Sequence, residues 1–345
     1  MPLFFCTLFD SNYLTRGLAM YYSLAEYCNN FHLFIFAFDN RCLEVLKKLK
    51  LDKVTIISLH DFENEELLSI KSSRTKKEYC WTCTSSIILY VLEHFKVDKC
   101  TYLDADLYFY SSPDVLINEL EDKSVLITVH RYSKGYDLAK TSGKYCVQFL
   151  TFKNDSSGLN VLKFWVKACR EWCFARFEDG KFGDQKYLDD WSIRFDCVHE
   201  LENIGGGVAP WNVQQYQIIN KENDLSIKKI QNGKISKLVF YHFHGLIFYK
   251  NNTIELTNPT YLLSRVVIKY LYKPYIEKLE HFRQNLKQIG YSIEENEMVE
   301  TTNKKPLTFK YIFYIYLKEI AKAISGITLR EKIKSQKNIF LKSSL

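Results

Sequence analysis

Short apolar runs alternate along this chain with stretches whose apolar residues recur at helical spacing. Apolar runs of strand length predict strands, and a period near 3.6 residues predicts helices. In the first part of the chain the predicted strands are residues 3–8, 31–38, 54–59, 99–103 and 124–129. The predicted helices between them are residues 12–27, 43–49 and 85–95. Strands that alternate with helices predict a mostly parallel α/β sheet with helices on both faces.

The second part of the chain has a less regular pattern. It predicts a strand at 145–152, a helix at 158–174, loops at 178–216, a last core strand at 237–243 and a helical stretch at 259–289 that breaks at Lys273-Pro274. We therefore expect four regions. They are a main domain at 1–258, a helical extension at 259–293, a polar linker at 294–306 and a basic, aromatic tail at 307–345 that is helical to residue 342.

The positive charge of the chain is concentrated in its tail. The net charge is +7, and residues 301–345 carry ten Lys or Arg against two Glu. The rest of the chain is close to neutral, which argues against a nucleic-acid-binding protein. Lysines mixed with aromatic residues at 307–342 are typical of a helix on an anionic membrane surface. The alternative is a helix that packs on the main domain with its charged face in water.

The compartment follows from the start of the chain and from its cysteines. There is no basic leader and no apolar stretch long enough to span a membrane. We expect a cytoplasmic protein, with the tail as a peripheral contact to the inner face of the membrane. Ten cysteines are then reduced. Cys80 and Cys83 have redox-motif spacing, but no second pair completes a zinc site, so we expect buried thiols.

Two carboxylates follow the predicted strand at 99–103. Alternate side chains of a strand point the same way, so Asp104 and Asp106 converge near its carboxyl end. Such a pair is unfavourable unless a cation holds it, and hard oxygen ligands at an open edge suit Mn²⁺ or Mg²⁺. A metal there would offset charge on a diphosphate leaving group. The alternative is a turn cap beside a solvated carboxylate.

The segment around these aspartates, Tyr-Leu-Asp-Ala-Asp-Leu-Tyr at 102–108, resembles the signature of GT-A-type glycosyltransferases that use nucleotide sugars. The chain is similar to family 8-like enzymes, such as glycogenin and bacterial lipooligosaccharide galactosyltransferases. It is more similar still to bacterial surface-polysaccharide transferases. Further matching segments follow in the family's order at 9–14, 182–188, 209–212 and 242–245. The resemblance implies a GT-A, Rossmann-like mixed sheet flanked by helices, with a C-terminal helical appendage.

The same resemblance assigns the donor site. The first strand-to-helix turn would hold the nucleotide base through backbone groups near Phe9, through Asp10 and through stacking on Tyr13. The alternatives are that Asp10 caps the helix and that Tyr13 is a core aromatic. Arg74 would neutralise the diphosphate or contact the donor sugar, unless it belongs to a charged surface loop.

The metal ligands implied by the family pattern are Asp104, Asp106 and His242. His242 is the first histidine of a late His-x-x-Gly motif, and a neutral imidazole can complete a site built on two carboxylates. Asp104 would also contact the donor. His244 lies two residues further on, and it would contact phosphate or acceptor.

The reactive face implied by the resemblance is Asp184 with Gln185, and the family retains anomeric configuration. Asp184 would orient sugar hydroxyls or stabilise oxocarbenium charge, although it could simply cap a helix. Asp189 and Asp190 are rival carboxylates, and a general base there would allow inversion. The loop at 205–212, with three glycines before Ala-Pro-Trp-Asn, is expected to form part of the acceptor site.

One position departs from the family pattern. Cys146 stands where family 8 proteins usually have an Asn that contacts the donor sugar, and Gln148 is a candidate substitute. This departure leaves the donor sugar open.

The sequence as a whole predicts a metal-dependent glycosyltransferase. A nucleotide-diphosphate sugar, with a UDP-sugar favoured, would donate to a surface glycan or lipid-linked acceptor. A nucleotidyltransferase is a weaker alternative, because residues 9–12 are not a Gly-rich phosphate loop. The other alternative is a non-catalytic scaffold of a polysaccharide-synthesis complex. The presence of both aspartates, of His242 and of the Asp184-Gln185 pair counts against it.

Overall fold

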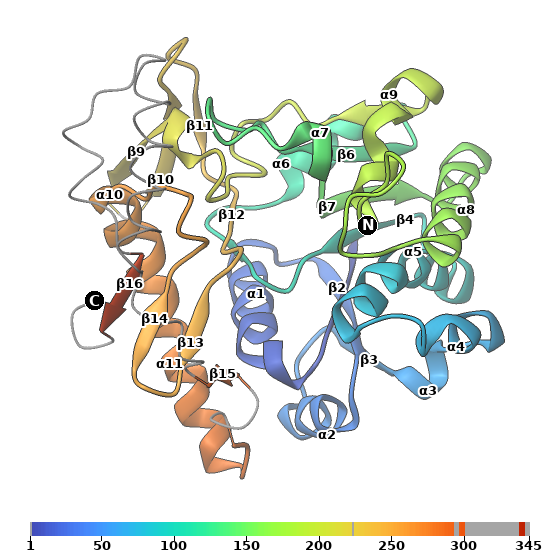
Figure 1. The fold of residues 1–345 in the computed structure, drawn as a ribbon, viewed down its shortest axis with the longest axis horizontal. Helices are drawn as coiled ribbons and strands as arrows, with labels where there is room; N and C mark the ends of the chain where they lie inside the picture. Colours follow the sequence, from blue (N-terminus) through green and yellow to red (C-terminus); the bar gives the residue numbers. More distant parts are fainter. Residues whose placement is uncertain (1, 223, 293–296, 301–337, 342–345) are drawn as a thin grey trace.

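The computed structural model describes residues 2–222, 224–292, 297–300 and 338–341 (Figure 1). Its main sheet has seven strands in the order β3-β2-β1-β4-β7-β6-β8. The strands β3, β2, β1 and β4 are parallel, β7 runs antiparallel to both of its neighbours, and β8 is parallel to β6. The predicted mixed sheet flanked by helices is confirmed.

The strands of the main sheet are β1 (Leu3–Phe9), β2 (Phe31–Ala37), β3 (Val54–Ser58), β4 (Lys99–Leu103), β6 (Val125–Val129), β7 (Tyr145–Lys153) and β8 (Val198–Glu200). The strands outside it are β5 (Leu107–Phe109), β9 (Tyr216–Lys221), β10 (Asp224–Lys229), β11 (Ile235–Lys237), β12 (Phe240–His242), β13 (Ile247–Tyr249), β14 (Thr253–Glu255), β15 (Met298–Val299) and β16 (Ile339–Leu341).

The α-helices are α1 (Leu14–Tyr27), α2 (Asn40–Leu49), α3 (Leu59–Phe62), α4 (Glu65–Lys71), α5 (Lys76–Phe95), α6 (Asp114–Ile117), α7 (Ala139–Ser142), α8 (Ser156–Glu171), α9 (Trp191–Arg194), α10 (Arg265–Val267) and α11 (Lys273–Gln288). The 3-10 turns are η1 (Ser11–Tyr13), η2 (Asn118–Leu120), η3 (Gln185–Asp190) and η4 (Val213–Gln215), and η5 (Ile268–Tyr272) is a π-helical turn.

Both faces of the main sheet are buried. Alternate residues of β1 point to opposite faces, so Phe5 and Phe9 pack with α1 and α2, whereas Cys6 and Leu8 pack with α5 and α8. This explains why the central strands read as nearly continuous apolar runs. Gly17 of α1 is part of this packing, because a Cβ at Gly17 would lie 2.5 Å from the ring of Phe9.

Helix α5 begins nine residues before the predicted start at residue 85. A capping box between Thr75 and Glu78 fixes this start, since each side chain binds the other residue's backbone. The first turns of α5 are rich in polar residues, which weakened the apolar pattern there. The earlier start places Lys76 and Lys77 on the helix.

A second body of structure packs beside α1. We expected residues 237–243 to form a last strand of the main sheet. Strand β12 instead pairs with β5, outside that sheet. Figure 1 shows α11 running beside α1, and the rings of Tyr22 and Phe282 stack across this contact at 5.1 Å. The predicted break at Lys273-Pro274 is the π-helical turn η5, after which Pro274 occupies the first turn of α11. The helical stretch starts at Arg265 rather than at residue 259.

The C-terminal residues that the structure describes form strands. Strand β15 lies inside the segment expected as a linker, and it pairs with β13. Strand β16 pairs with β14, so the prediction of helix is wrong for Ile339–Leu341. The rest of the 307–342 prediction lies outside the described residues, and the four region boundaries stay predictions. None of the described helices combines the length and apolar character needed to cross a membrane.

Candidate active site

The two aspartates of the 102–108 motif occupy the tight turn between β4 and β5. The amide of Leu107 donates to the carbonyl of Asp104, which closes this turn. Because β5 pairs with β12, His242 lies directly opposite Leu107. The amide of Phe243 also donates to the carbonyl of Asp106 at 2.9 Å. The β5–β12 ladder therefore delivers the late histidines to the aspartate turn.

The four side chains converge. His242 Nε2 lies 3.0 Å from Asp106 Oδ1 and 3.8 Å from Asp104 Oδ2. Ligand atoms of Asp106, His242 and His244 all lie within 4.8 Å of one another. In the part of the chain that the structure describes, no other group of three such residues is as close. We expected Asp104 as a metal ligand and His244 as a cofactor contact. The tightest set instead contains His244, and Asp104 lies beside it.

The electrostatics of the turn separate the two carboxylates. Burial raises the pKa of Asp104 to about 7, against the opposing effect of His242. Burial also acts to raise the pKa of Asp106, but the charge and hydrogen bond of His242 outweigh it and lower that pKa to about 2. Two carboxylates and two imidazoles at one strand end fit a divalent cation, because oxygen and imidazole nitrogen are both its usual ligands. The donor set therefore fits the predicted metal.

The Asp104 carboxylate and the His242 imidazole are each held by a side chain from the adjacent strands β4 and β7. The hydroxyl of Tyr102 donates to Asp104 Oδ1 at 2.8 Å. His242 Nδ1 lies 2.9 Å from Gln148 Oε1, an acceptor, so Nδ1 carries a proton. Nε2 faces the aspartates, where it carries a proton and bonds Asp106 when no metal is bound, and would offer its lone pair to a bound metal. Gln148 is fully buried, and its Nε2 has no hydrogen-bond partner among the described residues.

This position of Gln148 changes one expectation. Its amide orients His242, which does not support the idea that it replaces the family's Asn as a sugar contact. Cys146 is buried in a small cluster with Ala209 and Trp211, against Tyr132 and Tyr261. The thiol therefore packs under the loop at 205–212.

Asp184 lies buried near the carboxylate turn. It is 5% exposed and stands at the N-cap position of η3, yet its side chain makes no capping hydrogen bond. Burial, followed by the charge of Asp104, raises its pKa to about 8. The capping alternative is thus not what this carboxyl does. Gln185 donates its side-chain amide to the carbonyl of Ser142.

The two rival carboxylates are engaged elsewhere. Asp189 accepts from Lys186 Nζ at 2.6 Å and from the amide of Lys144 at 2.7 Å. Asp190 is solvent-facing and lies 3.8 Å from Arg194.

Of the residues predicted to bind the base at the first strand-to-helix turn, Phe9 and Asp10 are buried and Tyr13 is exposed. Asp10 accepts from the amide of Asn12 at 2.9 Å and pairs with Lys76 at 2.6 Å, so it does cap η1. The ring of Phe9 lies in the core, and its carbonyl accepts from Phe38. Tyr13 is 43% exposed, and the guanidinium of Arg16 lies 4.8 Å from its ring, so the core-aromatic alternative does not hold.

The cations near the site differ from the predicted one. Arg74 stacks on Phe174 at 3.9 Å and donates to the carbonyl of Arg170. Lys77 instead acts on His244, and buried Arg16 acts on Asp106. The sequence did hint at Arg16, because it lies three residues after Tyr13, about one turn along a predicted helix. Lys77 was missed because the start of α5 was placed too late.

The loop at 205–212 packs over the histidines. The ring of Trp211 lies 5.4 Å from that of His242 and 5.6 Å from that of His244. Asn212 is fully buried and bonds the carbonyls of His130 and Gly207, which fixes the loop. Gly207 has φ +78°, and a Cβ there would approach Thr128 to 2.8 Å, so glycine is required.

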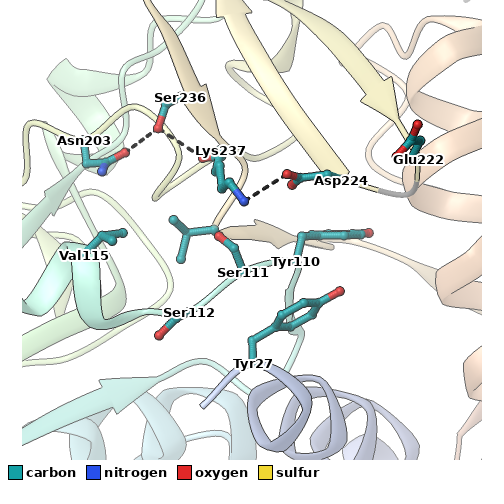
Figure 2. Close-up of a pocket in the computed structure, with 11 residues that line it drawn as sticks. Tyr27, Tyr110, Ser111, Ser112, Val115, Asn203, Glu222, Asp224, Ser236 and Lys237 are labelled. Atoms are coloured by element: carbon teal, nitrogen blue, oxygen red, sulfur yellow. Dashed lines mark hydrogen bonds and ion pairs between the residues drawn. The ribbon is translucent and has the colours of Figure 1, made fainter.

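A separate cavity of about 670 Å³ lies at the other end of β5 and β12 (Figure 2). Its lining residues include Tyr27, Tyr110 and Ser111, together with the Asp224–Lys237 ion pair. It contains none of the predicted site residues.

Comparisons with known proteins place the chain in a family. No protein-family model matches it. It is similar to the uncharacterised Bacillus subtilis protein YfnD, with 28% identity over 81% of this chain and 89% of that protein. It is 30% identical to the uncharacterised Bacillus subtilis protein YfnF, over 83% of this chain and 94% of that protein. Among solved structures it is similar to the galactosyltransferase LgtC, with 11% identity, a TM-score of 0.48, and coverage of 81% of this chain and 96% of that one. By its identity and coverage with YfnF, the chain belongs to the family of YfnD and YfnF.

Proposed function

We propose that the protein is a metal-dependent glycosyltransferase. It moves a sugar from a nucleotide-diphosphate sugar, with a UDP-sugar favoured, to a surface-glycan or lipid-linked acceptor. The observation that carries the proposal is the convergence of Asp104, Asp106, His242 and His244 at the carboxyl end of β4. The ordered set of family motifs between residues 3 and 250 supports it as well.

Asp106, His242 and His244 would hold the metal, and Asp104 lies beside them. A bound divalent cation would offset the charge that develops on the diphosphate leaving group. Imidazole ligands move the preference of the site from Mg²⁺ toward a transition metal, so Mn²⁺ is favoured. Gln148 contributes by holding His242 in the tautomer whose Nε2 can bind the metal.

The reacting sugar lies against Asp184 and Gln185. A carboxyl with a pKa of about 8 is largely protonated near neutral pH, so Asp184 can donate a hydrogen bond to a sugar hydroxyl. Asp189 and Asp190 are both paired with cations, so neither is placed to act as the general base that inversion requires. This favours retention of the anomeric configuration. Tyr13 stacks on the nucleotide base, and Lys77 supplies positive charge next to His244.

The acceptor occupies the side of the site formed by the 205–212 loop. Trp211 lies against both histidines, and Tyr132 and Tyr261 border the same cluster. Aromatic faces of this kind suit the apolar faces of sugar rings. The basic tail at 307–342 would bring the protein to an anionic membrane that carries a lipid-linked acceptor.

A thermal-shift panel tests the proposal. UDP-, GDP- and other nucleotide sugars are added to the full-length protein with Mn²⁺ or with EDTA. We expect one nucleotide class to raise the Tm by several degrees with Mn²⁺ only, because binding to the folded state stabilises it. Equal shifts with Mn²⁺ and EDTA would remove the metal from the proposal. If no nucleotide sugar shifts the Tm in either condition, the proposed donor site is wrong.

A further inference from the structure

The η1 turn, which carries Tyr13, is bonded by residues that lie far away in the sequence. Tyr291 follows α11, and its buried hydroxyl donates to the carbonyl of Ser11. Glu297 accepts from the amide of Thr15 at 2.8 Å and from the hydroxyl of Thr15 at 2.5 Å. Tyr291 and Glu297, which both follow α11 in the chain, thus hold the start of η1 and the first turn of α1.

Glu297 completes a helix start that lacks its own cap. The N-cap residue of α1, Tyr13, makes no side-chain capping hydrogen bond. The amide of Thr15 in the first helical turn would therefore be unpaired without Glu297. A carboxylate at a helix N-terminus is favoured by the helix dipole, and Glu297 is only 5% exposed.

An arginine holds Glu297 in place. The guanidinium of Arg283, on α11, lies 3.4 Å from Glu297 and is itself buried. It also covers the ring of Phe248 at 3.5 Å. On the same ring, at 5.7 Å, lies Arg16, whose guanidinium is 4.8 Å from the ring of Tyr13. A continuous set of packed groups therefore joins the C-terminal extension to the exposed tyrosine.

We propose that Glu297 and Tyr291 are positioning residues for the nucleotide base, and that α11 and these two residues are part of the donor site. They fix the η1 turn and the start of α1, and through these the position of Tyr13. The proposal rests on the nucleotide-binding role proposed above. One consequence is that a protein carboxylate already occupies the N-terminus of α1. The diphosphate must therefore meet its positive charge at the metal turn and at Lys77.

The test uses the full-length protein and three variants. Glu297→Ala removes the cap of Thr15, and Tyr291→Phe removes only the hydroxyl that reaches Ser11. Leu279→Ala is the control, because Leu279 is a fully buried residue of α11 that is outside the contacts to the turn. Titration calorimetry with UDP and with GDP, each with Mn²⁺, gives the Kd, and donor hydrolysis gives KM and kcat.

We expect Glu297→Ala to raise the nucleotide Kd about tenfold, because the binding-competent turn is then only a fraction of the population. KM for the donor should rise in step while kcat stays within about twofold of the parent, since the metal turn is untouched. Tyr291→Phe should raise the Kd about threefold. Leu279→Ala should lower the Tm and leave the Kd unchanged.

Two results overturn the proposal in different ways. If the parent binds nucleotide and Glu297→Ala binds it equally well, with only the Tm reduced as in Leu279→Ala, then Glu297 is merely structural and this inference fails alone. If the parent binds neither UDP nor GDP with Mn²⁺, the proposed function fails, and the positioning role fails with it.

Discussion

Replacing Gln148 by leucine tests how His242 is prepared for a metal. The substitution removes the Oε1 atom that lies 2.9 Å from His242 Nδ1. His242 and Gln148 are both buried, so the Nδ1–H group would be left without a partner and without water. The cost of such a buried, unsatisfied donor is about 1–3 kcal/mol. The imidazole can avoid this cost by changing tautomer or rotating, and in both cases Nε2 no longer offers its lone pair to the site.

The expected loss follows from this cost. At about 1.4 kcal/mol per tenfold, Mn²⁺ affinity should fall about 5- to 140-fold, which spans the range of about 10- to 100-fold usual for a residue that orients a metal ligand. Folding stability should change little, because leucine also removes Gln148 Nε2, a buried donor with no partner among the described residues. Titration of free Mn²⁺, followed by its electron paramagnetic resonance signal, measures the affinity.

The control is Thr101→Val, which breaks a buried side-chain hydrogen bond to Thr151 across β4 and β7 without touching His242. It should lower the Tm and leave Mn²⁺ affinity unchanged. If Gln148→Leu binds Mn²⁺ within twofold of the parent, the reasoning about His242 is refuted.

Three further predictions concern packing, protonation and the acceptor side. Gly17→Ala should destabilise the protein by about 1–3 kcal/mol in urea unfolding, because the new Cβ would lie 2.5 Å from the ring of Phe9. Adding Phe9→Leu should restore most of this loss. Additive losses of stability in the double variant would contradict the contact. Burial raises the pKa of Asp184 to about 8, so between pH 5 and 8 the folded state binds a proton that the unfolded state has lost. The free energy of unfolding should therefore fall as pH rises through this range. Asp184→Asn should make the free energy of unfolding less dependent on pH, and an unchanged dependence would contradict the burial argument. Trp211→Ala should reduce transfer to an acceptor at least about tenfold while donor hydrolysis persists, and an equal loss of both would move Trp211 out of the acceptor site.

The local parts of the site could be predicted from the sequence. Asp104 and Asp106 follow an apolar run, so a strand end and a shared direction were predictable from a period of two. The late His242 also ends a predicted strand. The convergence of these groups depends on the β5–β12 pairing, which nothing in the local pattern encodes. The family motifs supplied that connection.

The long-range contacts could not be predicted in this way. Arg74 and Lys77 are close in sequence, yet the capping box that starts α5 decides which of them lies near the histidines. Glu297 lies in a segment that is polar throughout and was expected to be a linker. Its role depends on Arg283 and on the start of α1, 282 residues earlier, which has no side-chain cap of its own. Periodicity carries no information about such pairs.

The most direct test of the central claim is Mn²⁺-dependent hydrolysis of the nucleotide sugar identified by thermal shift. The parent, Asp106→Asn and Asp189→Asn are compared at equal Mn²⁺, and Asp189 serves as a control because Lys186 pairs with it away from the metal turn. The account predicts a loss of at least about a hundredfold for Asp106→Asn and near-parental activity for Asp189→Asn. Hydrolysis by Asp106→Asn at the parental rate would contradict it.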